Sequence, residues 1–183
     1  EVVLPSTLTK IGDNAFRGTQ LTRLALPEGL TEIGSGAFSG SSLKEVVLPS
    51  TLTKIGFAAF HNTKITELYI PDSVTNLDSR VFGFHGNYSN DLPTLTKVSL
   101  PSQLQSTAEP FFGQKSLKEV VFRGNWKIIP SGLFSGTGLE KLVIPEGVTE
   151  IGSYAFSGSS LKEVVLPSTL KKIGTGAFQR TQL

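Results

Sequence analysis

The sequence predicts an α/β solenoid, mainly β, in which short coils of chain stack along one axis. The first observation is a fixed period: an aliphatic residue recurs every 22 positions, with one longer step of 30. These leading residues are Leu21, Leu43, Ile65, Leu95, Leu117, Leu139, Leu161 and Leu183. Counted from them, position 7 is usually proline and position 18 is phenylalanine in every unit. A period of this size is typical of repeat solenoids.

The first third of each unit predicts a strand. In the unit 43–64, the apolar residues Val46 and Leu48 stand at positions 4 and 6, between residues that point to the other face. This alternation is typical of a strand with one buried face. We expect Pro49 to end the strand, because proline has no N–H to donate to a neighbouring strand.

The rest of each unit predicts a return path closed by a short helical turn. Leu52 and Ile55, at positions 10 and 13, are expected to point inward, and Gly56 to form a turn. The spacing from Ile55 to Phe60 suits one turn of helix. Stacked coils would place the position-18 rings in one column: Phe16, Phe38, Phe60, Phe82, Phe112, Phe134, Phe156 and Phe178.

Length and composition predict one domain over residues 1–183, of about eight coils, and a fragment of a longer chain. The net charge of +2 gives no reason to expect a nucleic-acid partner. The absence of cysteine excludes disulfides. No apolar run is long enough for a membrane helix. Both ends of the sequence break off inside a repeat, so we also expect possible end-to-end self-association through uncapped coils.

The repeat pattern LxxVxLPxxLxxIGxxAFxG closely resembles the BspA-like leucine-rich repeats of bacterial surface proteins. The resemblance covers the whole chain. It implies a right-handed, curved superhelix with a parallel sheet on the concave side. It also implies a cell-surface or secreted binding or adhesion module rather than an enzyme. One departure is the absence of the cysteine that often follows the Ala-Phe pair, where this chain has residues such as Gly40 and Ser41.

Two rows of side chains are expected on the outer face of the predicted sheet. Position 3 carries charges that often alternate in sign: Glu1, Arg23, Glu45, Glu67, Lys97, Glu119, Lys141 and Glu163. They form either a solvated, self-neutralising ladder or a surface matched to a charged partner. Position 5 is mostly apolar: Val3, Ala25, Val47, Tyr69, Ser99, Val121, Val143 and Val165. This row reflects either strand propensity or a contact strip, with Tyr69 as the best single contact.

Departures from the repeat are candidate functional sites. The insertion 83–94 is eight residues longer than the equivalent slot of other units, and its glycine, asparagine and proline residues predict a loop. Phe84, His85 and Tyr88 give it aromatic rings that suit binding. The alternative is a neutral insertion whose rings pack against the flank.

The two coils after the insertion also depart from the pattern. Thr107 stands where isoleucine is expected, and Pro130 replaces the glycine of position 14. Trp126 occupies position 10, which favours a core role over ligand binding. Arg123 and Lys127 flank it and are candidates for an anion site, although no glycine nest accompanies them. We expect local distortion of the solenoid here.

No pattern predicts catalysis, a cofactor or a metal. The two histidines, His61 and His85, lack a third ligand at motif spacing. Asp78 and Asp91 do not form a calcium-loop pattern. No serine lies in a nucleophile elbow. We therefore expect no enzyme activity, no cofactor and no metal.

The favoured hypothesis is a non-catalytic module that binds a protein on a host or neighbouring cell. The candidate binding residues are Tyr69, Phe84, His85, Tyr88, Arg123 and Lys127. One alternative is a structural spacer that displays other domains of the parent protein. The other is a glycan-binding module, for which Tyr69, Tyr88 and Trp126 would supply stacking rings.

Overall fold

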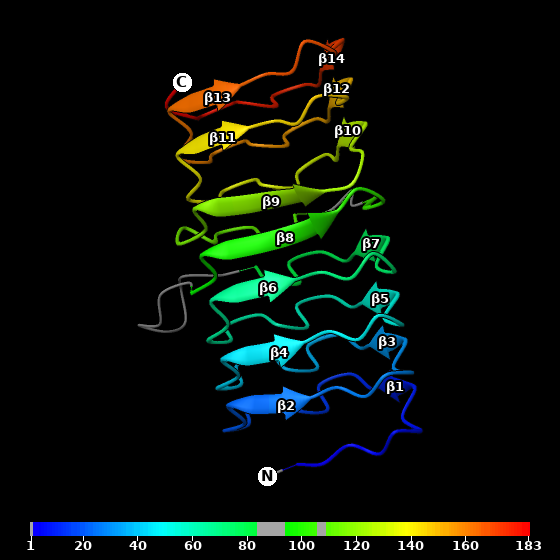
Figure 1. The fold of residues 1–183 in the computed structure, drawn as a ribbon. Coiled ribbons are helices and arrows are strands. Elements are labelled where there is room, and N and C mark those ends of the chain that lie inside the picture. Colours follow the sequence, from blue (N-terminus) through cyan, green and yellow to red (C-terminus); the bar gives the residue numbers. More distant parts are fainter. Residues whose placement is uncertain (1, 84–93, 106–108) are drawn as a thin grey trace.

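The computed structural model describes residues 2–83, 94–105 and 109–183 of the chain. Coil follows coil along one axis, with the N-terminus at one end of the stack and the C-terminus at the other (Figure 1). Each coil has three sides, and the repeat of the sequence is therefore a repeat in space. The predicted β-solenoid is confirmed.

The first side is a long-strand sheet built from positions 3–5 of the repeat. Its strands are β2 (Arg23–Ala25), β4 (Glu45–Val47), β6 (Glu67–Tyr69), β8 (Lys97–Pro101), β9 (Glu119–Arg123), β11 (Lys141–Val143) and β13 (Glu163–Val165). They pair in parallel in three ladders, β2-β4, β6-β8-β9 and β11-β13, and in the middle ladder Glu67 lies opposite Lys97 and Lys97 opposite Glu119. The 30-residue step therefore leaves the register of this sheet intact.

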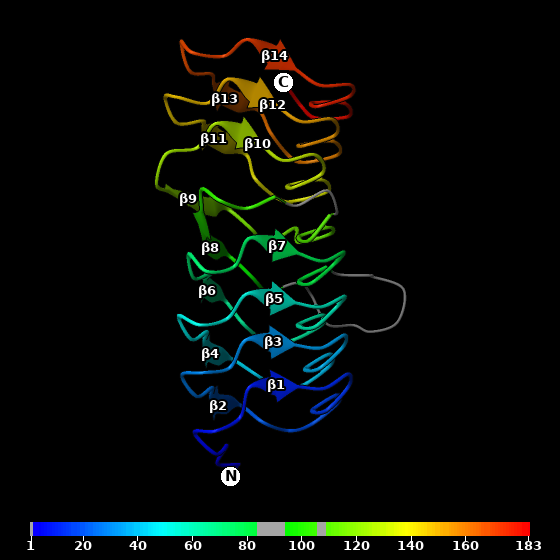
Figure 2. The ribbon, with the colours of Figure 1, turned by 90° about the vertical axis from the view of Figure 1, so that its right-hand side faces the viewer.

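The second side is a short-strand sheet at positions 12 and 13, which the sequence analysis did not predict as strands. It consists of β1 (Lys10–Ile11), β3 (Glu32–Ile33), β5 (Lys54–Ile55), β7 (Asn76–Leu77), β10 (Ile128–Ile129), β12 (Glu150–Ile151) and β14 (Lys172–Ile173). Figure 2 shows these strands in one column, with the turns projecting beside them. They pair in parallel as β1-β3-β5-β7 and β10-β12-β14.

The third side, here called the turn flank, comprises positions 14–20. The prediction of short helical turns is wrong, because the described residues contain no helix. Alternate backbone N–H groups leave the local turn: Phe16 donates to the Ala37 carbonyl of the next coil at 2.7 Å, whereas Arg17 donates to the Asn14 carbonyl at 3.1 Å. A helix needs every N–H for its own carbonyls, so this sharing between coils excludes one.

Proline is a weaker strand end than predicted. Most long strands do end at position 5, two residues before the proline, but β8 runs through Pro101. Its neighbour β9 has Arg123 at that position and pairs with Pro101. The last pair of this ladder can form because Arg123 still has an N–H.

The core lies between the three sides and holds the apolar residues of positions 4, 6, 10, 13, 17 and 18. Trp126 is buried, 1% exposed, which agrees with a core role. The ring of Phe122 meets it edge-on, with centroids 5.1 Å apart. The leucines, isoleucines and valines of neighbouring coils fill the remaining space, so each coil depends on the next for burial.

The predicted phenylalanine column is present, with one correction. Successive rings stack at centroid distances from 5.2 to 6.1 Å. The fifth ring is Phe111, however, and not Phe112. The coil that begins at Leu95 therefore has one residue fewer before its ring than the other coils have. It has one residue more between this ring and the start of the next coil. Phe112 is half-buried on the turn flank, where the Arg80 guanidinium lies 5.7 Å from its ring centroid.

Candidate binding surface on the long-strand sheet

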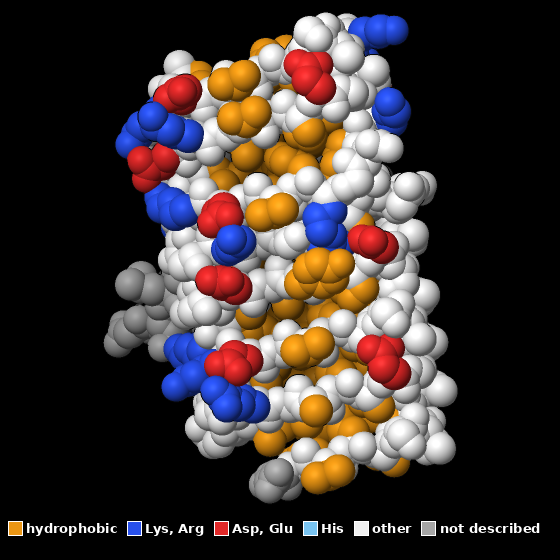
Figure 3. Space-filling view, viewed as in Figure 1, with side chains coloured by type: hydrophobic (Ala, Val, Ile, Leu, Met, Phe, Trp, Pro, Cys, Tyr) orange, Lys and Arg blue, Asp and Glu red, His pale blue; other side chains and the backbone are white. Residues whose placement is uncertain are grey.

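The outer face of the long-strand sheet carries a mostly apolar stripe at position 5. Figure 3 shows it as an orange row along the middle of the sheet. Its exposed members are Val3, Val47, Tyr69, Val121, Val143 and Val165. Val47 is 80% and Val143 66% exposed, which is unusual for branched aliphatic side chains. The stripe exists because position 5 points away from the core in every strand.

Charges on one side of this stripe pair with each other. At position 3, Arg23 lies 3.1 Å from Glu45, and Lys97 lies 2.7 Å from Glu119. Lys141 and Glu163 form a third pair at 2.8 Å. The pairing lies between adjacent strands, as the self-neutralising ladder requires. Exposed pairs of this kind contribute little to stability.

Tyr69 is held in place by an arginine from two coils further along the stack. The Arg123 guanidinium carbon lies 3.7 Å from the centre of the Tyr69 ring, and the Tyr69 side chain remains 56% exposed. Nη2 of Arg123 donates to Asp72 at 2.6 Å and to the carbonyl of Ile70, and Nη1 donates to Ser99 at 3.1 Å. Cation–π stacking and these hydrogen bonds fix both side chains. We call this group, Tyr69, Asp72, Ser99 and Arg123, the tyrosine clamp.

Two hollows lie beside the clamp. One of about 300 Å³ is lined by Glu67, Tyr69, Lys97 and Ser99, with Leu68 as its apolar floor. The other, of about 270 Å³, is lined by Asp72, Pro101, Ser102, Gln103, Arg123 and Gly124. An ideal Cβ on Gly124 would lie 2.6 Å from Ser102 Oγ, and its φ is +72°, so this position favours glycine. The hollows add hydrogen-bonding groups on both sides of the exposed ring.

The predicted anion site between Arg123 and Lys127 is divided in the structure. Arg123, whose side chain is 20% exposed, turns toward the preceding coils and bonds Asp72. Lys127 is exposed and turns the other way, with Nζ 3.8 Å from where a Cβ on Gly147 would stand. Sequence reasoning missed Asp72 and Ser99 as the partners of Arg123. The signal was the replacement of proline by arginine at position 7.

The remaining predicted residues fall in two groups. Phe84, His85 and Tyr88 lie outside the described residues, as does Thr107. His61 is half-buried on the turn flank.

In the described ranges, no group of three or more histidine, cysteine, aspartate or glutamate side chains could hold a metal ion. Those same ranges contain no helix long and apolar enough to cross a membrane.

Solved structures with the same architecture come from bacterial leucine-rich repeat proteins. One from Treponema pallidum is 28% identical, covers 97% of this chain and 74% of its own length, and gives a TM-score of 0.60. One from Bacteroides ovatus is 25% identical over 98% of this chain, with a TM-score of 0.56. This chain spans 64% of the Bacteroides protein. A leucine-rich cell surface protein from Faecalibacterium prausnitzii, 22% identical with a TM-score of 0.51, shares the fold.

Sequence comparison supplies the family. Comparison with curated proteins gives no match. The family model of the BspA type leucine-rich repeat region matches residues 1–89 and 84–183, which together cover the chain. The match comprises six copies of the family model. The chain belongs to the BspA-type leucine-rich repeat family.

Proposed function

We propose that this chain is a non-catalytic binding module, part of a cell-surface or secreted protein, that takes a protein partner on the long-strand sheet. Leucine-rich repeat proteins are in general protein-interaction modules. The observation that carries the proposal is the exposed apolar stripe at position 5, interrupted by the tyrosine clamp. An exposed apolar row bordered by charges is typical of a protein interaction site.

The short-strand sheet provides an internal comparison. Its outward position 12 is also exposed, but it carries mainly polar residues: Lys10, Glu32, Lys54, Asn76, Ile128, Glu150 and Lys172. Strand propensity acts on both sheets. It therefore does not account for the apolar stripe on one sheet only, which favours a contact strip over propensity alone.

The clamp suits the centre of such a contact. Tyrosine and arginine are the residues most often found at energetic centres of interfaces, and a ring fixed in advance loses little freedom on binding. The hollows beside it can receive side chains of a partner. A glycan-binding role is less well supported, because the buried Trp126 removes one of its three proposed stacking rings.

The test compares two variants that change the charge equally. Val47→Lys with Val143→Lys places two charges in the stripe, and Thr175→Lys with Gln179→Lys places two on the exposed turn flank. Each variant is immobilised and exposed to a detergent extract of surface-labelled epithelial cells, and captured proteins are identified by mass spectrometry. We expect a partner retained by the wild type and the flank variant and reduced about tenfold by the stripe variant.

Two further variants test the insertion and the tyrosine clamp separately. Replacing Phe84, His85 and Tyr88 by serine tests the contribution of the insertion. Tyr69→Ser tests the contribution of the clamp, and serine is chosen because Ser99 already occupies the equivalent position of the next coil. Equal capture by the stripe and flank variants would contradict binding on this sheet. Capture of nothing by the wild type would favour the structural spacer.

A further inference from the structure

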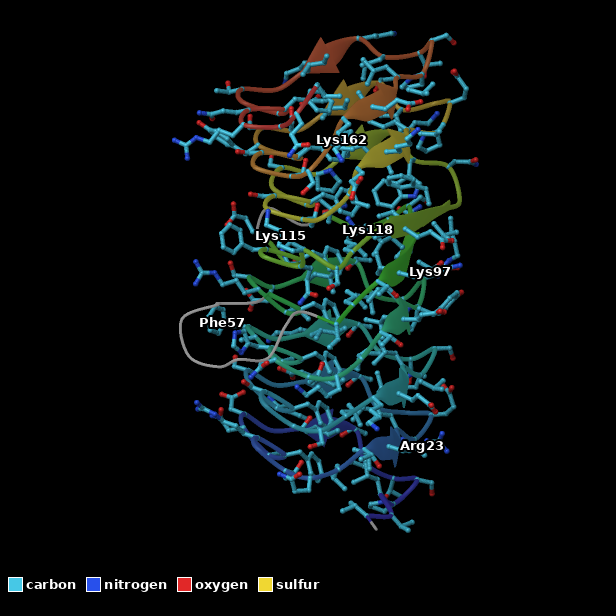
Figure 4. The ribbon with its side chains drawn as sticks, turned by 90° about the vertical axis from the view of Figure 1, so that its left-hand side faces the viewer. Arg23, Phe57, Lys97, Lys115, Lys118 and Lys162 are labelled. Atoms are coloured by element: carbon cyan, nitrogen blue, oxygen red, sulfur yellow. The ribbon has the colours of Figure 1, made fainter. Side chains whose placement is uncertain are left out.

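A second concave site lies on the turn flank, away from the long-strand sheet. It is a pocket of about 400 Å³ lined by four successive coils, and its walls include Arg17, Phe57 and Arg80. Figure 4 shows Phe57 on the opposite side of the stack from Arg23 and Lys97, which lie on the long-strand sheet. The pocket is therefore separate from the surface proposed above.

The hollow arises from the order of large and small residues along the stack. The second of these coils has Ser35, Gly36 and Ser39 at positions 15, 16 and 19, and these small residues form the floor. The coil before it has Arg17 at position 19, and the coil after it has Phe57 at position 15. Larger side chains thus rise on both sides of a coil that supplies almost none.

The charged side chains among the described residues that line the pocket are two arginines, Arg17 and Arg80, and none of these described residues is a carboxylate. The carboxylate of Asp13 instead accepts a hydrogen bond from the Ser35 N–H at 2.8 Å. Within the described part of the chain, Arg17 forms no ion pair, and its one side-chain bond is a 3.4 Å contact to Asn14 Oδ1. The Arg17 guanidinium can therefore bind a carboxylate with two parallel hydrogen bonds.

Phe57 gives the pocket an aromatic wall. Its side chain is 47% exposed, although most other coils have a serine, threonine or aspartate at the same position: Asp13, Ser35, Ser79, Ser131, Ser153 and Thr175. An exposed ring at one position of a polar row is a cost in water unless something covers it. A flat or cyclic ligand against this ring would bury that surface.

We propose that this pocket binds a carboxylate carried on a ring. Arg17 takes the carboxylate, the ring packs on Phe57, and the hydroxyl groups of Ser35 and Ser39 face the remaining polar atoms. Two classes of compound share this chemistry: aromatic acids and acidic sugars. The site does not depend on the protein-binding surface of the long-strand sheet.

The experiment measures binding to the whole chain by calorimetry and by chemical-shift titration. The probes are benzoate and glucuronate, with acetate as a carboxylate without a ring and benzyl alcohol as a ring without a charge. We expect benzoate or glucuronate to bind at least about tenfold more tightly than acetate and benzyl alcohol. The tighter of the two identifies the aromatic acid or the acidic sugar as the ligand class.

Variants tie the binding to the pocket. Arg17→Gln and Phe57→Ser should each weaken the better probe about tenfold. Ser35→Phe should abolish binding by filling the hollow with the residue that Phe57 shows the repeat to accept, and its thermal unfolding reports whether the fold is kept. Arg180→Gln removes an exposed arginine of the same flank outside the pocket and should leave binding unchanged.

Three results would overturn the proposal. The first is the absence of saturable binding of both ring carboxylates to the wild type. The second is acetate binding as tightly as benzoate and glucuronate, which indicates general attraction of anions. The third is unchanged binding in the folded Ser35→Phe variant.

Discussion

At the scale of single residues, Gly56 at position 14 is required by the neighbouring coil and not by its own conformation. An ideal Cβ on Gly56 would lie 2.8 Å from the backbone nitrogen of Ser35 and 2.9 Å from the carbonyl carbon of Gly34. None of the described residues at this position has a φ in the left-handed region. The sequence analysis expected a turn glycine, but the close approach of two backbones is what excludes a side chain.

This explanation predicts different outcomes at equivalent positions. Gly12 occupies the same place in the first coil, and a Cβ there would meet nothing within 4 Å. Gly56→Ala should lower the free energy of unfolding by about 1–3 kcal/mol through overpacking. Gly12→Ala should change it by no more than about 1 kcal/mol. Urea denaturation of both variants measures the difference, and equal losses would contradict the explanation.

At the scale of elements, the strands could be predicted and the turns could not. The period-2 pattern around Val46 and Leu48 identified the long strands because alternation is a local property. The turn flank instead depends on which carbonyl each N–H reaches, and Phe16 reaches Ala37 in the next coil. A spacing that suits a helical turn does not reveal this exchange between coils, and neither does it reveal the two-residue strands at positions 12 and 13.

Another set of ion pairs links residues beside the long strands, and its contribution to the stability of the fold depends on pH. Glu140 precedes β11 and lies between Lys118 and Lys162, with carboxylate–Nζ distances of 2.6 and 3.0 Å. The hydrogen bond from Lys118, followed by that from Lys162, lowers the pKa of Glu140 from 4.5 to about 2. A carboxyl with a lowered pKa in the folded state stabilises the fold above its unfolded pKa and loses this effect in acid.

The expected outcome is a stability difference between wild type and Glu140→Gln that is constant above about pH 5 and shrinks as the pH falls from 4.5 toward 2. Urea denaturation at a series of pH values measures it. In a background with Lys118→Met and Lys162→Met, the same substitution should show no such change between pH 4.5 and 2. A stability difference that does not change with pH in the wild-type background would show that Lys118 and Lys162 do not stabilise the Glu140 carboxylate.

The two main residues of the tyrosine clamp could be predicted from the sequence, but the contact between them could not. Tyr69 was predicted as a contact and Arg123 as an anion ligand, each from its own departure from the repeat. Their contact joins coils separated by another coil, and its distances follow only from the stacked structure. Aligning the coils would have placed Arg123 at position 7 and Asp72 at position 8, but not the direction in which a long side chain turns.

At the scale of the whole molecule, the stack is continuous through its irregular coils. The long-strand sheet keeps its register across the 30-residue step, and the rings of Phe82, Phe111 and Phe134 follow one another without a gap. A strict period of 22 residues predicted Phe112 for the column, because it assumes that equivalent residues have the same position number in every coil. In the structure Phe111 is the ring that packs between its neighbours in the column. This continuity carries both proposed sites, since each is formed by side chains from several coils.

The most direct measurement of this continuity compares Phe111→Ala with Phe112→Ala by urea denaturation. Phe111 is fully buried between two rings, and its truncation should lower the free energy of unfolding by about 3–5 kcal/mol. Phe112 contacts Arg80 on the turn flank, and its truncation should cost about 1 kcal/mol. A larger loss for Phe112→Ala, or equal losses for the two variants, would contradict a single uninterrupted stack.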